Sequence, residues 1–119
     1  MKRIIYLLTV FVFIAGCATM TDRTLVSNSK SLNSLSLGMP RAEVLKIMGT
    51  EPVMSEGQSV DNPYRTDIFK GANKTYEILY YVSDVKINDG SISDNELTPV
   101  VLLDGKLVGW GWDFVQTLR

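Results

Sequence analysis

The chain has 119 residues, 12 basic and 13 acidic side chains, no histidine and a single cysteine. A nearly neutral charge excludes the dense basic surface that nucleic-acid binding requires. The lack of histidine excludes Ser-His-Asp and Cys-His catalysis and histidine-ligated metals. We therefore expect one modest domain with no cofactor, no metal site, no nucleic-acid partner and no small-molecule substrate.

The N-terminus has the pattern of a secretory signal peptide. Lys2 and Arg3 precede an apolar stretch over residues 4–14, which ends at the small residues Ala15 and Gly16. A basic start, a short apolar run and a small-residue exit are typical of such a peptide. The run is shorter than the roughly 20 residues that a transmembrane helix needs. We assign residues 1–16 to the signal peptide.

The only cysteine follows this stretch directly. Ile14, Ala15, Gly16 and Cys17 together resemble the bacterial lipoprotein box. The resemblance implies cleavage before Cys17 and acylation, with palmitate for example, of its sulfur and of the new amine, so that acyl chains hold the protein on a membrane. Two or more chains anchor stably where one does not. A buried core cysteine and a free thiol are the competing interpretations. Ala18, in place of aspartate, implies by the same resemblance the outer membrane, where we expect the periplasmic face.

The mature chain would span residues 17–119. Without Lys2 and Arg3 it has 10 basic and 13 acidic side chains, a net charge of about −3. Residues 17–26 are rich in small polar side chains and are predicted to be a flexible tether. Residues 27–119 form a single predicted domain, with a short helix expected near residues 27–35.

The clearest helix signal lies between Pro40 and Gly49. Proline suits the first turn of a helix because its missing N–H has no partner there, and glycine suits the left-handed position that ends one. Glu43 near the start and Lys46 near the end complement the helix dipole. The sequence therefore predicts a helix of about nine residues.

The second half of the domain has the patterns of antiparallel strands. Residues 54–63 are predicted to be a surface loop, followed by strands at 64–70 and 76–82. Asp104-Gly105 between the apolar stretches 100–103 and 106–112 predicts a hairpin. The predicted fold class is α+β, with two N-terminal helices packed on one face of a roughly four-stranded antiparallel sheet.

The helix region also resembles a known family. The shared positions are Leu35, Gly38, Met39, Glu43, Val44, Met48, Gly49 and Pro52. They resemble the helix motif of the BamE-like (SmpA/OmlA) small outer-membrane lipoproteins, and the likeness extends over most of residues 27–112. It implies the two-helix-plus-sheet fold shared with β-lactamase inhibitory protein domains. It further implies a role as an accessory to outer-membrane protein assembly.

The segment VGWGWDF, residues 108–114, contains both tryptophans. As a strand it would direct Val108, Trp110, Trp112 and Phe114 to one face and leave the glycines on the other. The aromatic side chains would then be either core or, together with Tyr81, a partner-binding site, because tryptophan is a favoured interface anchor. The bare glycine face would let another backbone approach closely.

The remaining chemistry signals are weak. Gly90 and Glu96 have the spacing of EF-hand positions 6 and 12, but positions 1 and 3 would be Val85 and Ile87, which cannot ligate calcium. A plain polar loop is the better interpretation. The 13 scattered carboxylates are best interpreted as solvated surface.

These observations favour a lipid-anchored, non-catalytic module that binds envelope proteins. One alternative is an inhibitor or sensor of a periplasmic enzyme, which would expose Tyr64, Tyr81 and Trp112 on a concave sheet face. A more remote alternative is a small hydrolase, which would need a deep pocket with neighbouring carboxylates.

Overall fold

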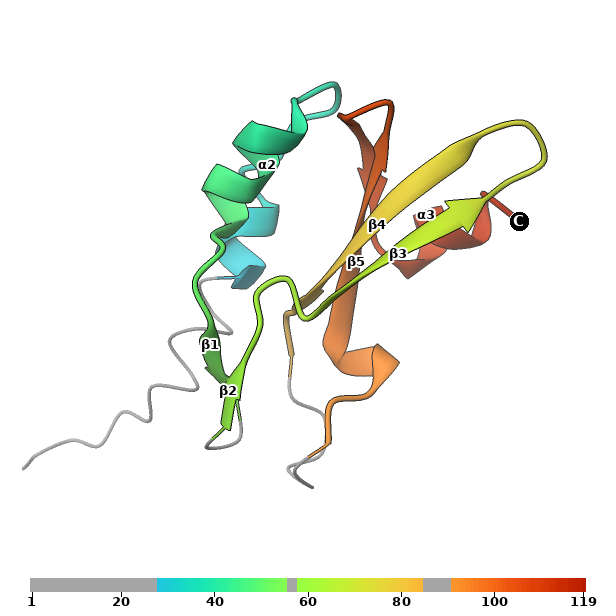
Figure 1. Cartoon of the computed structure of the whole chain (residues 1–119). Helices are drawn as coiled ribbons and strands as arrows, with labels where there is room; N and C mark the ends of the chain where they lie inside the picture. Colours follow the sequence, from blue (N-terminus) through green and yellow to red (C-terminus); the bar gives the residue numbers. More distant parts are fainter. Residues whose placement is uncertain (1–27, 56–57, 85–90) are drawn as a thin grey trace, which may run out of the picture.

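A computed structural model describes residues 28–55, 58–84 and 91–119. Its centre is a four-stranded antiparallel sheet in the order β3-β4-β5-β6, and a separate two-stranded sheet pairs β1 with β2 (Figure 1). The elements are α2 (Arg41–Met48), β1 (Val53–Ser55), β2 (Gln58–Val60), β3 (Arg65–Lys70), β4 (Thr75–Val82), η1 (Asp94–Glu96), β5 (Leu97–Leu103), β6 (Lys106–Trp110) and α3 (Trp112–Gln116). Residues 28–32 are also helical.

This architecture corrects the predicted fold class. The layout of two N-terminal helices on one face of a single sheet is wrong. The structure has two antiparallel sheets and short helices, and one of these, α3, is C-terminal. Residues 54–63, predicted to be a loop, contribute strands to the hairpin β1-β2. Both errors arose from short elements whose local patterns are too brief to be recognised.

The helix predicted between Pro40 and Gly49 is confirmed as α2. Pro40 is the N-cap, and Gly49 ends the helix at a φ of 83° while its N–H donates to the Leu45 carbonyl. Glycine adopts this backbone conformation without the penalty that a side chain would bring. Val44 and Met48 are the buried residues of the helix. They fix α2 against the sheet.

The two predicted hairpins are also confirmed. β3 pairs with β4, from Arg65 opposite Tyr80 to Lys70 opposite Thr75. β5 pairs with β6 around the turn at Asp104 and Gly105, which have φ angles of 53° and 74°. Positive φ at both central residues matches the twist of antiparallel strands.

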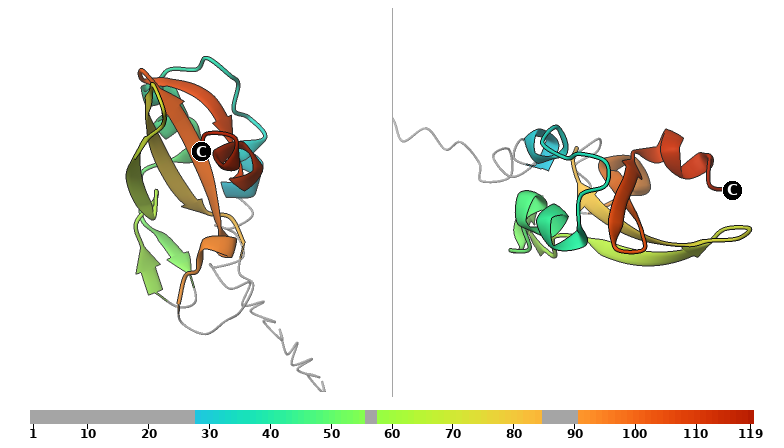
Figure 2. Two further views of the ribbon diagram at one scale, coloured as in Figure 1. Left: turned by 90° about the vertical axis from the view of Figure 1, so that its right-hand side faces the viewer. Right: turned by 90° about the horizontal axis from the view of Figure 1, so that it is seen from above.

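The central sheet is covered on both faces, because β4 alternates its side chains between two cores. Leu79 and Tyr81 belong to a cluster with Val44 and Met48 of α2. Ile78, Tyr80 and Val82 belong to a second cluster with Val115 of α3. Figures 1 and 2 show α2 and α3 on their separate sides of the sheet. The second cluster is the one that positions the candidate site.

Gly111 is the residue that creates α3. At a φ of 93° it ends the strand that the alternating pattern predicted would continue, and it serves as the N-cap of α3. The chain then turns back across the sheet. A Cβ at Gly109 would lie only 2.7 Å from atoms of the Phe114 ring. At Gly109, the glycine face predicted to receive another backbone is therefore covered by the chain's own phenylalanine, whereas a Cβ at Gly111 would meet no atom within 4 Å.

Two buried asparagines connect the N-terminal helical residues to the rest of the domain. The Asn28 side-chain amide donates to the Val82 carbonyl at 2.7 Å and to Asn62 Oδ1 at 3.3 Å. Asn62 in turn donates to the carbonyls of Met48 and Gly49. Buried polar groups that are satisfied in this way specify one arrangement of the segments they join. No helix in the described part of the chain is both long and apolar enough to cross a membrane.

Candidate functional site

The most distinctive surface feature is a groove between the β3-β4 hairpin and α3. It has a volume of about 390 Å³. Its wall includes Arg65 and Asp67 from β3, Tyr80 from β4, Asp94 from η1 and Trp112 from α3. Segments far apart in the sequence meet here because α3 folds back over the second core cluster. We refer to this feature as the aromatic groove.

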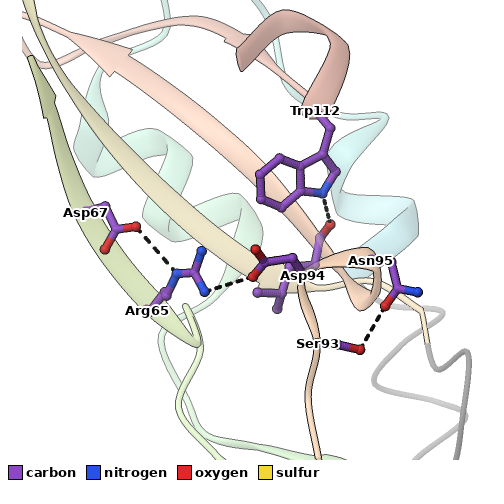
Figure 3. A network of polar contacts seen from close by, with 7 residues as sticks. Arg65, Asp67, Ser93, Asp94, Asn95 and Trp112 are labelled. Carbon is purple, nitrogen blue, oxygen red and sulfur yellow. Dashed lines mark hydrogen bonds and ion pairs between the residues drawn. The ribbon is translucent and has the colours of Figure 1, made fainter. Parts of the chain in front are cut away.

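Arg65 lies at the centre of the polar contacts in the groove. Its guanidinium carbon is 4.1 Å from the centroid of the Tyr80 ring, within the range of a cation–π contact. Nη1 donates to Asp94 Oδ1 at 2.9 Å, and Nε lies 3.5 Å from Asp67 Oδ2 (Figure 3). That Nε is buried and has no hydrogen-bond partner. The arginine is thus held from three sides while one of its donors stays unused.

The charge state of this cluster follows from its contacts. Burial acts to lower the pKa of Arg65, but hydrogen bonds with Tyr80 and Asp94 outweigh it and raise that pKa above its ordinary value. Burial also raises the pKa of Tyr80. At neutral pH the groove therefore presents a fixed guanidinium cation against a neutral phenol ring.

Trp112 closes the groove on the side of α3. Its Nε1 donates to the Leu97 carbonyl at 2.9 Å, and its ring centroid lies 5.7 Å from that of Tyr80 with a tilt of 36°. Tilted aromatic pairs at this distance are favourable beyond the area they bury. A second cation, Arg119, also lines the groove. No carboxylate of the described residues forms an ion pair with Arg119.

The structure separates the aromatic residues that the strand pattern grouped together. Trp110 packs against the core cluster under α2, whereas Trp112 and Phe114 pack on the opposite face. The shared face predicted for Val108, Trp110, Trp112 and Phe114 is wrong. Val108 packs with the second cluster and Trp110 with the first, because the β5-β6 register shifts beside Val108. Gly111 then turns the chain between Trp110 and Trp112. Of this group, Trp112 lines the groove.

Tyr81 is a core residue and offers no surface to a partner. Its side chain is completely buried, and its hydroxyl has no hydrogen-bond partner. Burial, opposed by the charge of Arg41 and reinforced by that of Glu77, raises the pKa of Tyr81 to about 12. The concave face with exposed Tyr64, Tyr81 and Trp112 is not found, since Tyr64 and Trp112 are themselves only partly exposed.

Alkaline titration tests the burial of Tyr81. The unfolded tyrosine ionises near pH 10, before the folded one, so the free energy of unfolding should fall as the pH rises from about 10 to 12. The loss attributable to this group is up to about 2–3 kcal/mol. Urea unfolding at several pH values, compared with Tyr81→Phe, measures it. The variant should lose no stability at pH 7 and show a shallower alkaline slope, and an unchanged slope would contradict the prediction.

The remaining predicted positions lie partly outside the described residues. Cys17 and the lipobox residues Ile14, Ala15 and Gly16 lie outside the described residues. The first half of the calcium-loop alternative, residues 85–90, also lies outside them, whereas residues 91–96 are described and Glu96 is 1% exposed. Within the described ranges, no cluster of three or more His, Cys, Asp or Glu could hold a metal ion.

Sequence reasoning missed Arg65 and Asp94. The available signal was the period-two spacing of Arg65, Asp67 and Phe69 in a predicted strand. In the structure these residues pair with Tyr80, Ile78 and Tyr76 of β4. This signal could be read only with the register of the β3-β4 hairpin, because the register decides which side chains of β3 and β4 lie on the same face of the sheet.

The fold and the groove define a small domain of two antiparallel sheets and short helices with an aromatic, charged surface groove. Residues 18–117 match the family described as "Protein of unknown function (DUF3192)", and the chain belongs to that family. No curated protein and no solved structure gave a significant match.

Proposed function

We propose that this chain is a lipid-anchored outer-membrane lipoprotein whose domain binds other envelope proteins and catalyses no reaction. Acyl chains on Cys17 hold it at the periplasmic face of the membrane. The domain acts as an accessory to outer-membrane protein assembly or to envelope integrity. The support for the anchor is the signal pattern that ends in Ile14-Ala15-Gly16-Cys17.

The observation that carries the binding role is the composition of the aromatic groove. Tyrosine, tryptophan and arginine are the residues enriched at the energetic centres of protein interfaces, and Tyr80, Trp112 and Arg65 meet in this one groove. Their mutual contacts hold these side chains in place before binding. This lowers the conformational entropy that they lose when a partner binds. The groove suits a protein segment with an apolar side chain for the aromatic rings and an acidic group for Arg119.

Photo-crosslinking in intact membranes tests the binding role. The crosslinker replaces Asp94, whose side chain is 65% exposed beside the groove. The matched control carries it at Lys46, an exposed position on α2. We expect adducts with outer-membrane or periplasmic assembly proteins from position 94 and none from position 46. Equal adducts at both positions, or none at either, would count against a groove-centred partner.

A separate comparison tests the anchor. Mass spectrometry of the mature protein should find Cys17 at the N-terminus carrying acyl chains, and Cys17→Ser should abolish membrane fractionation and the crosslinks. An unmodified N-terminus on a freely released product would refute the proposed lipid anchor. The crosslinking experiment would still test the proposed binding role of the groove.

A further inference from the structure

Four charged side chains line the aromatic groove, and they are unequally paired. Arg65 contacts two carboxylates, that of Asp94 at 2.9 Å and that of Asp67 at 3.5 Å (Figure 3). Arg119 lines the same groove and forms no ion pair with any described residue. One cation of the groove is therefore available to an anion from outside. A second becomes available wherever a carboxylate of the groove leaves Arg65.

The position of Arg65 is fixed by contacts other than the one with Asp94. Its guanidinium carbon lies 4.1 Å from the centroid of the Tyr80 ring, and its Nε lies beside Asp67, which belongs to the same strand, β3. Neither contact uses Nη1, the nitrogen that donates to Asp94 Oδ1. If Asp94 moves away, the guanidinium therefore stays in place with Nη1 ready to donate to another acceptor.

The contact between Arg65 and Asp94 is the one that a ligand can most readily replace. The Asp94 side chain is 65% exposed and that of Arg65 is 38% exposed, and ion pairs this exposed contribute little to stability because water screens them. Among the described residues a single hydrogen bond joins the two side chains, whereas the strongest arginine–carboxylate pairs form two in parallel. Another carboxylate can thus take the place of Asp94 at small cost.

Apolar side chains surround this cationic centre. Phe69, Ile78 and Val115 line the groove together with the rings of Tyr80 and Trp112. The groove volume of about 390 Å³ lies within the range of pockets that hold small ligands. An occupant that fits both parts of the groove carries an aromatic or apolar side chain close to a carboxylate.

We propose that Asp94 occupies the position of a carboxylate of the partner, and that docking exchanges Asp94 for an acidic side chain of the partner segment at Arg65 Nη1. This inference rests on the proposed binding function and adds the chemistry of the occupant, a protein segment in which an aromatic residue adjoins Asp or Glu. A segment without a carboxylate cannot replace Asp94 and gains nothing from Arg65. The exchange therefore selects acidic segments.

NMR titration of the ¹⁵N-labelled full chain in detergent tests the exchange. The probes are the dipeptides N-acetyl-Phe-Asp-amide and N-acetyl-Phe-Asn-amide, which differ only in one carboxylate. The indole N–H signal of Trp112 reports on the groove, and that of Trp110, which packs against the other core cluster, is the internal control. We expect the native chain to bind the Asp dipeptide about threefold more tightly than the Asn dipeptide.

Two substitutions separate the exchange from a general effect of charge. Asp94→Asn removes the competing carboxylate and should bind the Asp dipeptide about fivefold more tightly than the native chain does. Asp67→Asn is the matched control, because it removes the same charge from the same groove. Asp67 contacts the buried Nε of Arg65, however, which no ligand can reach. This variant should change the affinity at most about twofold, since screened charges act weakly at a distance.

The outcomes that would overturn the exchange are specific. Equal tightening by Asp94→Asn and Asp67→Asn would show an effect of net charge alone. Equal affinity of the native chain for the two dipeptides, or no shift of the Trp112 signal with either, would also refute the inference.

These results are independent of the crosslinking test of the proposed function, because the crosslinker at position 94 itself replaces Asp94. Adducts from position 94 without a preference between the dipeptides would support the groove as a binding site and refute the exchange. A preference for the Asp dipeptide without adducts would support the exchange at Arg65 and count against an envelope-protein partner.

Discussion

Replacing Trp112 with alanine is expected to lower the free energy of unfolding by about 3–5 kcal/mol. The indole packs in the core cluster under α3, contacts the Tyr80 ring and donates a hydrogen bond to the Leu97 carbonyl. Its removal would leave a cavity between α3 and the sheet and one carbonyl without its donor. Urea unfolding followed by circular dichroism measures the loss.

Trp112→Phe is the matched control for this substitution. It keeps an aromatic ring beside Tyr80 and removes the hydrogen bond, whose net contribution is about 1 kcal/mol. The phenylalanine variant should therefore be clearly more stable than the alanine variant. If Trp112→Ala costs less than about 1 kcal/mol, the indole does not stabilise α3 as the structure indicates.

Gly109→Ala is expected to destabilise the domain by about 1–3 kcal/mol, although alanine is ordinarily a mild replacement in a strand. The added methyl group would lie 2.7 Å from the Phe114 ring, so the ring must move. Because Phe114 belongs to α3 and packs against the second core cluster, that movement disturbs the packing of α3 on the sheet. Thermal unfolding of the full chain measures the effect.

A double-mutant cycle assigns the cost to this contact. Phe114→Ala removes the obstructing ring, so Gly109→Ala should cost much less in the Phe114→Ala background than in the native one. The coupling energy of such a directly contacting pair is expected to be about 1–2 kcal/mol. Additive effects of the two substitutions would contradict the contact. The stability lost in Gly109→Ala would then arise from the backbone and not from the Phe114 ring.

The elements that sequence reasoning predicted well are those with strong local signals. α2 has proline at its start and glycine at its end, and the β5-β6 hairpin has Asp-Gly at its turn. Each of these conformations depends on residues within a few positions along the chain. The sequence alone therefore sufficed for them.

The aromatic groove could be predicted only in part. Trp112 was a candidate binding residue from its type alone, whereas Arg65 and Asp94 were not. Their 2.9 Å contact joins β3 to η1 across 29 residues of sequence. Such a pair depends on the strand register and on the path of the loop. Neither of these can be read from the local pattern of residues.

By itself, the sequence determined the exclusion of histidine-dependent chemistry, α2 and the two hairpins. Lipid attachment at Cys17 stays a prediction from the sequence. Only the tertiary structure decided where the aromatic residues go. Gly111 at a positive φ divides Trp110 from Trp112, and the strand order leaves β3 as the open edge. The physical reason is that one backbone rotation at a glycine redirects every following side chain, whereas residue pattern reports only the period within an element.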